Sequence, residues 1–140
     1  AVYEWWINAY AISKKVNEIQ APPNSVGMRF FNVWAEKVSR SDMLYRMLEE
    51  KTATYLTRHK RDWIHVNDIV TAIATLIPSS YNGVLDVGTG NPVSVIDLAK
   101  KMGMEHLPIK EDTPGERETT CADISQLMEL GWTPTIDILD

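Results

Sequence analysis

A chain of 140 residues with 44% hydrophobic residues can bury one core but is short for two domains. Its net charge of −5, with scattered basic residues, gives no electrostatic footprint for nucleic acid. The single Cys121 excludes an internal disulfide and a cysteine-cage metal site, and no apolar run is long enough to span a membrane. We therefore expect one unit, residues 1–140, that is cytoplasmic and needs no metal, membrane or nucleic acid.

The first predicted helix covers residues 10–19 and carries Tyr10 and Lys14, four positions apart. Residues with this spacing lie on the same helix face, so the phenol and the ammonium can approach one another. A positive charge about 4 Å from a phenol, in a partly desolvated site, favours the phenolate by roughly 4 kcal/mol. Tyr10 could then accept a proton near neutral pH. The competing interpretation is a solvated helix face, because a Tyr-x-x-x-Lys match alone is a weak signal.

The next segments alternate between strand and helix patterns. Pro22 and Pro23 end the first helix, and residues 26–33 form an almost wholly apolar strand with Asn32 near its end. Ser41 and Asp42 supply capping residues for a helix through residue 50. A short strand is expected at residues 53–56. The pattern is that of strands buried on both faces of a parallel sheet.

The second half of the chain repeats this alternation. Asn67 is the expected N-cap of a helix through residue 77, and residues 84–87 form a strand that leads into the glycine turn 88–90. Ser94 opens a helix to residue 102, residues 107–109 form an edge strand, and Asp123 caps a helix through residue 129. The alternation predicts an α/β fold with a largely parallel sheet.

Seven short segments add a family resemblance: 10–14, 28–33, 61–68, 87–90 with 94–95, 114–116, 122–125 and 130–132. In this order they resemble the carboxyl-terminal half of an extended short-chain dehydrogenase/reductase, and within it the NAD-dependent nucleotide-sugar epimerases and dehydratases, with UDP-glucose 4-epimerase the nearest kind. The resemblance implies the carboxyl-terminal part of a Rossmann-like fold with a small substrate-binding lobe. Residues 1–36 would hold the catalytic helix and the last part of the cofactor-domain sheet, and residues 37–140 mainly the lobe.

The resemblance implies a catalytic pair and a cofactor. Tyr10 would be the general base that takes a proton from a sugar hydroxyl while NAD accepts the hydride, and Lys14 would bind the nicotinamide ribose and assist Tyr10. Phe31 would lie near the nicotinamide. NADP in place of NAD stays open.

The resemblance also implies a substrate site. Asn32 would contact the nucleotide sugar, Arg61 its diphosphate, Tyr55 and Trp63 its base and ribose, and Glu116 its ribose. Each has a structural alternative. Asn32 could end a strand, Arg61 could form an ordinary ion pair, Tyr55 and Trp63 could be core aromatics, and Glu116 could be a solvated loop residue.

The chain departs from the family pattern in three places. Residues 34–37 replace a Tyr-Gly-Pro-Arg-like turn, and Thr113 stands where an arginine is usual. The nucleotide sugar, and the choice among epimerisation, dehydration and decarboxylation, therefore stay open. No glycine-rich strand, turn and helix precede Tyr10. We expect the glycine-rich amino-terminal half to be absent, the isolated chain to be inactive, and the protein to form a homodimer or to pair with that half.

Two other functions remain open. Residues 84–90, with Glu111 and Asp112 about twenty residues on, also resemble the first motif of S-adenosylmethionine-dependent methyltransferases. That interpretation leaves Tyr10, Asn32 and Arg61 without a role. The other alternative is a non-catalytic fragment or partner module of the epimerase/dehydratase family, which makes it uncertain from sequence that the chain is itself an enzyme.

Overall fold

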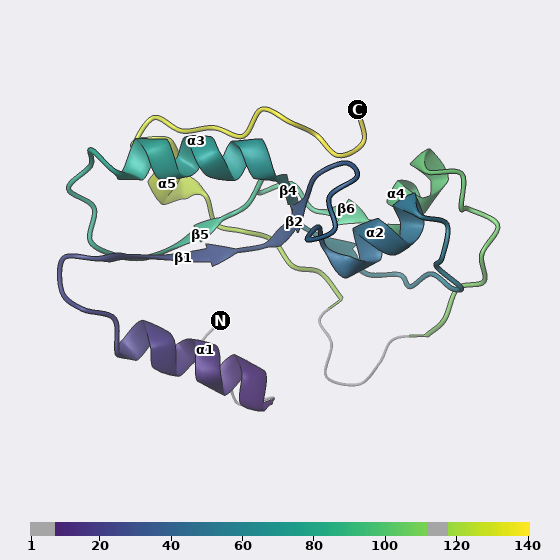
Figure 1. Ribbon diagram of the computed structural model, residues 1–140, viewed down its shortest axis with the longest axis horizontal. Coiled ribbons are helices and arrows are strands. Elements are labelled where there is room, and N and C mark those ends of the chain that lie inside the picture. The colour runs from purple at the N-terminus through teal and green to yellow at the C-terminus, as the bar shows by residue number, and fades with distance from the viewer. Residues whose placement is uncertain (1–7, 112–117) are drawn as a thin grey trace.

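The computed structural model describes residues 8–111 and 118–140 and has an α/β fold (Figure 1). Two of its three strand pairs, β1–β5 and β2–β4, are parallel, and the short pair β3–β6 is antiparallel, which confirms the predicted α/β class with largely parallel strands. The elements in chain order are α1 (Ala9–Ile19), β1 (Val26–Phe30), β2 (Asn32–Trp34), α2 (Met43–Glu49), β3 (Lys60–Arg61), β4 (Trp63–His65), α3 (Val66–Leu76), β5 (Gly83–Val87), β6 (Val93–Ser94), α4 (Val95–Lys101) and α5 (Ser125–Glu129).

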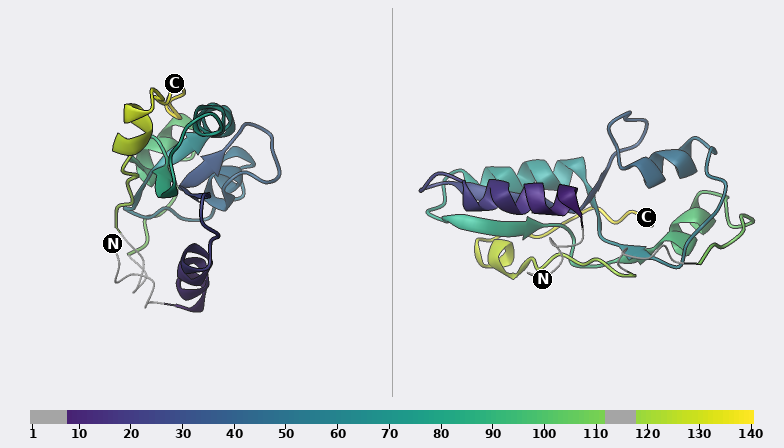
Figure 2. Two further views of the ribbon diagram at one scale, coloured as in Figure 1. Left: turned by 90° about the vertical axis from the view of Figure 1, so that its left-hand side faces the viewer. Right: turned by 90° about the horizontal axis from the view of Figure 1, so that it is seen from below.

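The β1–β5 pair lies between two helical layers. Helices α3 and α5 lie on one side of the pair, and α1 lies on the other (Figures 1 and 2). One hydrophobic core fills the first of these interfaces, and residues 26, 28 and 33 pack against it. Its buried members come from β4, α3, β5, α5 and the segment after α5: Ile64, Ile69, Ala72, Leu76, Leu85, Val87, Leu127 and Trp132.

A second core lies at the other end of the molecule, under α2 and α4 (Figure 1). Tyr45 and Leu48 of α2 and Leu98 of α4 are buried in it, together with Trp34 of β2. Each of the two cores therefore draws on segments from both sides of residue 36, the boundary predicted between the sheet and the substrate lobe.

The strand predicted at residues 26–33 is broken at Phe31. Its amide donates to the carbonyl of Val87 on β5 at 3.2 Å, whereas the amide of Asn32 donates to the carbonyl of Asp62 at 2.9 Å. The chain thus changes partner from β5 to β4 within two residues. Asn32 begins β2 rather than ending a longer strand, and it pairs in register with Trp63.

Helix capping follows the prediction at two helices and departs from it at two others. Asp42 caps α2 and Ser94 caps α4, each accepting a hydrogen bond from a backbone N–H group in the first turn. The predicted cap Asn67 is wrong, because His65 is extended and its Nδ1 accepts from the Asn67 amide at 3.0 Å. The N-cap of α5 is Ile124, without a side-chain cap hydrogen bond, and not the predicted Asp123. The strands predicted at 53–56 and 107–109 shrink to one parallel bridge between Leu56 and Ile109.

Helix α1 has no buried residue, and an ion pair joins it to the sheet. The Arg29 guanidinium of β1 donates from Nε to Glu18 Oε1 at 2.6 Å and from Nη2 to Glu18 Oε2 at 2.8 Å. These hydrogen bonds hold the pKa of Glu18 below its ordinary value, against the opposing effect of burial. Within the described residues, no helix has the length and apolar character needed to cross a bilayer.

We expect Glu18→Gln to lower the free energy of unfolding by about 0.5–1 kcal/mol at pH 7, the range of a partly exposed ion pair. Because the folded pKa of Glu18 is lowered, its contribution is present above the unfolded pKa, about 4.3, and is lost as the pH falls through the folded value. Urea unfolding of both proteins between pH 7 and pH 3 measures this. If the difference in unfolding free energy between the unaltered chain and Glu18→Gln stayed constant down to pH 3, the charge of Glu18 in its pair with Arg29 would not be what stabilises the protein.

Candidate functional site

Tyr10 and Lys14 lie together on α1, beside a cavity. The Lys14 Nζ atom is 5.3 Å from the centre of the Tyr10 ring, and Tyr10 is 71% exposed. Both side chains line a cavity of about 580 Å³ between α1 and β1, which also contains Gly27 and Phe30. The helical spacing therefore produces the predicted proximity, and the pair faces a space large enough to admit a ligand.

Phe30 is shared by this cavity and a second one. It lines the Tyr10–Lys14 cavity and also a cavity of about 410 Å³ whose other lining residues include Phe31, Asn32 and Arg61. The partner change at Phe31 places Asn32 at this position, since the chain there turns from β5 towards β4. Three of the residues predicted from the sequence, Phe31, Asn32 and Arg61, thus line one cavity.

A third cavity, of about 270 Å³, extends the second one towards α2. Asn32 and Arg61 line it as well, and Tyr55 joins them there. Tyr55 is 43% exposed, and the Lys110 Nζ atom lies 4.3 Å from the centre of its ring. An exposed aromatic ring beside an arginine suits the stacking of a flat, polar ligand group.

Two neighbouring segments fix the position of Arg61. It lies in β3, opposite Val93 of β6, and its Nη1 donates to the carbonyls of Lys60 at 2.9 Å and Glu118 at 3.3 Å. Two carboxylates that lie near Arg61 in the sequence, Asp62 and Asp68, are both buried and accept hydrogen bonds from backbone N–H groups. The backbone of Arg61 is therefore held by strand pairing, and the residue lines two cavities.

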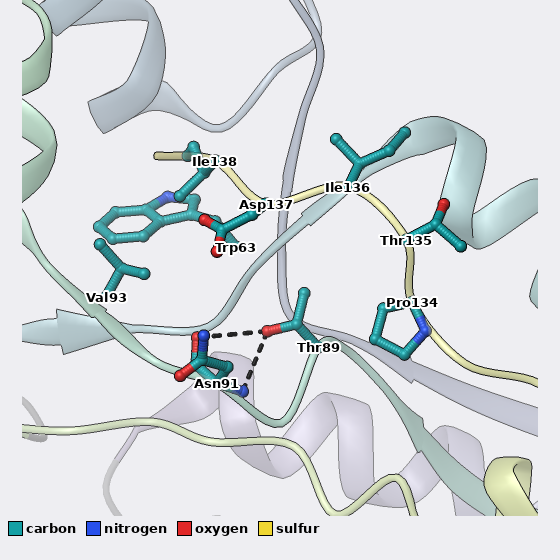
Figure 3. A pocket seen from close by; sticks show the side chains of 9 residues that line it. All are labelled: Trp63, Thr89, Asn91, Val93, Pro134, Thr135, Ile136, Asp137 and Ile138. Atoms are coloured by element: carbon teal, nitrogen blue, oxygen red, sulfur yellow. Dashed lines mark hydrogen bonds between the residues drawn. The ribbon is translucent and has the colours of Figure 1, made fainter. Parts of the chain in front are cut away.

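Trp63 lies apart from this group. It is 2% exposed, belongs to the core under α2 and α4, and lines a separate cavity of about 190 Å³. Figure 3 shows its ring between Val93 and Ile138, with the pair Thr89 and Asn91 across the cavity. The indole N–H group donates to Asp42 Oδ2 at 3.4 Å, and Asp42 lines the second and third cavities. Glu116, the remaining predicted residue, lies outside the described residues.

The side chain of Asp62 holds the glycine turn after β5, residues 88–90, by accepting hydrogen bonds from its backbone amides. The buried carboxylate accepts from Thr89 N at 2.7 Å, Gly90 N at 2.9 Å and Ala122 N at 3.0 Å, and also from the Thr89 hydroxyl. A Cβ atom on Gly88 would lie 2.8 Å from Asp62 Oδ2, so glycine is needed there for close approach. The N–H groups that could bind a phosphate or a ribose are already used, which argues for a structural role of this turn.

The structure also shows pocket residues that the sequence did not indicate. Arg40, Asp42 and Thr120 line the cavity of Asn32 and Arg61, and Thr120 Oγ1 is buried there without a hydrogen-bond partner among the described residues. Asp42 was recognisable as a helix cap, but no spacing connects it to Asn32. In residues 8–111 and 118–140, no three His, Cys, Asp or Glu side chains group to hold a metal ion.

No protein-family model matches the chain. Solved structures do. The enzyme WbmG of Bordetella bronchiseptica, in complex with NAD, superposes with a TM-score of 0.77 at 22% identity, over 94% of this chain and 46% of that one. UDP-glucose 4-epimerase of Thermotoga maritima, with UDP-glucose, superposes with a TM-score of 0.70 at 22% identity, over 93% of this chain and 49% of that one. The NAD-dependent NDP-hexosamine 5,6-dehydratase TunA superposes with a TM-score of 0.73 at 22% identity, over 92% of this chain and 49% of that one.

These values describe a shared backbone over a part of each enzyme, since the chain spans about half the length of the structures that it matches. The overall path of the backbone is thus common to all of them. The chain therefore has the Rossmann-like fold of one half of an NAD-dependent nucleotide-sugar epimerase or dehydratase, as the order of its sequence motifs predicted.

Proposed function

We propose that this chain forms the catalytic helix and the substrate pocket of an NAD-dependent nucleotide-sugar epimerase or dehydratase, similar to UDP-glucose 4-epimerase. The observation that carries the proposal is that three neighbouring cavities share lining residues. Tyr10 and Lys14 line the first, Phe30 lines the first and the second, and Asn32 and Arg61 line both the second and the third. A candidate proton acceptor and a candidate anion-binding arginine thus line cavities that lie next to each other.

The residues around the first cavity fit NAD. Tyr10 and Lys14 are exposed on one face of α1, and their cavity is open, as a cofactor held partly by another segment requires. NAD, when bound, supplies the hydride acceptor. The Lys14 ammonium would donate hydrogen bonds to the nicotinamide ribose, and Phe31, in the adjoining cavity, would pack beside the ring.

Tyr10 would accept the proton of the sugar hydroxyl. The O–H bond of the sugar breaks, a new O–H bond forms at the Tyr10 Oη atom, and the electron pair stays on the sugar oxygen. The Lys14 side chain lies beside the Tyr10 ring and would place its positive charge next to the residue that takes the proton. In this step Tyr10 would take the proton, and Lys14 would supply the neighbouring positive charge.

The nucleotide part of the substrate would lie along the second and third cavities, with the reacting end of the sugar extending to Tyr10 in the first. A planar, permanently charged guanidinium suits a diphosphate, which gives Arg61 its role and adds the neighbouring Arg40. Asn32 would contact the sugar, and Tyr55 would stack on the base. Trp63 would act only from behind the pocket wall, and Glu116 would contact the ribose.

Self-association is part of the proposal. Ile12, Val16 and Ile19 are exposed on α1 at the i, i+4, i+7 spacing of one helix face. We propose that this face packs against a second copy of the chain or against a cofactor-binding half.

The 140-residue chain on its own is expected to bind UDP-glucose but not NAD at micromolar concentration. The physical reason is that its one described glycine-rich turn has its N–H groups bonded to Asp62, whereas Arg61 and Arg40 line an open cavity. Calorimetry with each ligand measures both, and Arg61→Ala should weaken UDP-glucose binding at least tenfold.

The matched control is Arg58→Ala, because Arg58 is exposed and three positions away. Equal losses for the two variants would remove Arg61 from the pocket. No binding of UDP-glucose to the unaltered chain would contradict the substrate assignment, and micromolar binding of NAD would contradict the need for another cofactor-binding segment.

A further inference from the structure

The carboxylate of Asp42 lies at the junction of the two substrate cavities, since Asp42, Asn32 and Arg61 line both of them. We propose that Asp42 is a positioning residue: it fixes the side-chain amide of Asn32 in one orientation and thereby sets which hydrogen-bonding atoms Asn32 offers to the substrate. The substrate part of this inference rests on the proposed function, and the orientation of the amide does not.

Both oxygens of Asp42 are engaged by N–H donors. Oδ1 accepts from Asn32 Nδ2 at 2.9 Å. Oδ2 accepts from the Tyr45 amide at 3.2 Å, which makes Asp42 the N-cap of α2, and from Trp63 Nε1 at 3.4 Å. Asn32 and Trp63 are register partners on β2 and β4, so one carboxylate bridges two neighbouring strands and the start of a helix.

The contact fixes the amide because a carboxylate has only acceptor atoms. The Nδ2 atom of Asn32 must therefore face Asp42, which leaves Oδ1 as an acceptor and the second N–H as a donor for other partners. A sugar hydroxyl can both donate and accept, and it can use such a pair. An amide free to rotate would lose this selection and would cost more entropy to order on binding.

Asp42 is itself held rigidly. Its amide donates to the Val33 carbonyl at 2.7 Å. The buried Ser41 beside it closes the preceding loop, since its Oγ donates to the Ala35 carbonyl at 2.6 Å and accepts from the Ala35 amide at 2.9 Å. The position of the carboxylate is thus set by the backbone on both sides, which is what a positioning residue requires.

The charge of Asp42 is compatible with an anionic ligand. Arg40 and Arg61 line the same cavity and place two positive charges against one negative charge. The two carboxylate oxygens of Asp42 also accept hydrogen bonds from N–H groups of the protein itself, on Asn32, Tyr45 and Trp63. The carboxylate therefore acts on the substrate through Asn32 rather than by direct contact.

Three variants separate this role from helix capping. Asp42→Ser keeps a good N-cap but is too short to reach Asn32. Asp42→Asn keeps the cap through its one carboxamide oxygen, but its NH2 group then faces Asn32 and can only donate. Asp42→Ala removes both the cap and the acceptor for Asn32. NMR of the Asn32 side-chain amide in the unliganded chain and calorimetry with UDP-glucose are the two readouts, with thermal unfolding as the control for stability.

We expect Asp42→Ser to unfold at nearly the unaltered temperature, to lose the distinct, hydrogen-bonded Asn32 amide resonances, and to bind UDP-glucose about tenfold more weakly. Asp42→Asn should also keep the unfolding temperature, but it should alter the Asn32 resonances and weaken the binding, because its NH2 group cannot accept from Asn32 Nδ2. Unchanged Asn32 resonances in Asp42→Ser, or unchanged affinity despite altered resonances, would overturn the proposal. If the unaltered chain did not bind UDP-glucose, the proposed function would fail, and the amide resonances, which need no ligand, would still decide whether Asp42 orients Asn32.

Discussion

Tyr10→Phe should lower kcat of the NAD-loaded enzyme that contains this chain by about 10²–10⁴-fold, the usual contribution of a general base. The substitution removes only the hydroxyl, and Tyr10 lies on the exposed surface of α1, so the fold should not change. The KM for UDP-glucose should change little, because Arg61, Asn32 and Tyr55 line other cavities than Tyr10 does. Steady-state kinetics with UDP-glucose and NAD measures both constants.

Two adjacent lysines provide the control for the same assay. Lys14→Met should lower kcat because Lys14 is the residue beside the Tyr10 ring. Lys15→Met should not, since the Lys15 ammonium instead lies 3.5 Å from Glu18 Oε2. Full activity of Tyr10→Phe would remove Tyr10 from the chemistry. Equal losses for both lysine variants would show a general effect of charge on α1.

Asp62→Ala should lower the free energy of unfolding by about 3 kcal/mol or more. It leaves the amides of Thr89, Gly90 and Ala122 without their acceptor, and an unsatisfied buried group costs about 1–3 kcal/mol. The loss would fall on the turn between β5 and β6 and on the segment before α5, both of which bond to Asp62. Urea unfolding followed by circular dichroism measures it.

The matched control is Asp97→Asn, which changes an exposed aspartate in the first turn of α4 and should cost less than about 0.5 kcal/mol. Asp62→Asn should fall between the two, because an amide keeps one acceptor but turns donors towards the buried N–H groups. A loss below about 1 kcal/mol for Asp62→Ala would contradict the view that this carboxylate holds the turn.

The parts of the fold that depend on local interactions could be predicted from the sequence. Asp42 and Ser94 cap helices by accepting hydrogen bonds from amides three positions along the chain, so the local sequence is enough to predict their role. The break at Phe31 could not be predicted in this way. It arises because β1 and β2 pair with two strands, β5 and β4, that come much later in the chain.

The candidate site shows the same division. The proximity of Tyr10 and Lys14 follows from helical geometry alone, and it is present. The shared cavity of Asn32, Tyr55 and Arg61 was inferred only through the resemblance to a family, since nothing local links these positions. The buried position of Trp63 and the contact between Asp42 and Asn32 depend on strand pairing and helix packing, which spacing in the sequence does not reveal.

The most direct test of the account is to map where a nucleotide sugar binds on the chain. Amide NMR spectra recorded during a titration with UDP-glucose should show shifts at Asn32, Tyr55 and Arg61, and smaller ones at Phe30 and Tyr10. A parallel titration with S-adenosylmethionine should leave Thr89 and Gly90 unchanged, because their amides are bonded to Asp62. Shifts confined to the glycine turn, or no shifts at the three pocket residues with UDP-glucose, would contradict the proposed site.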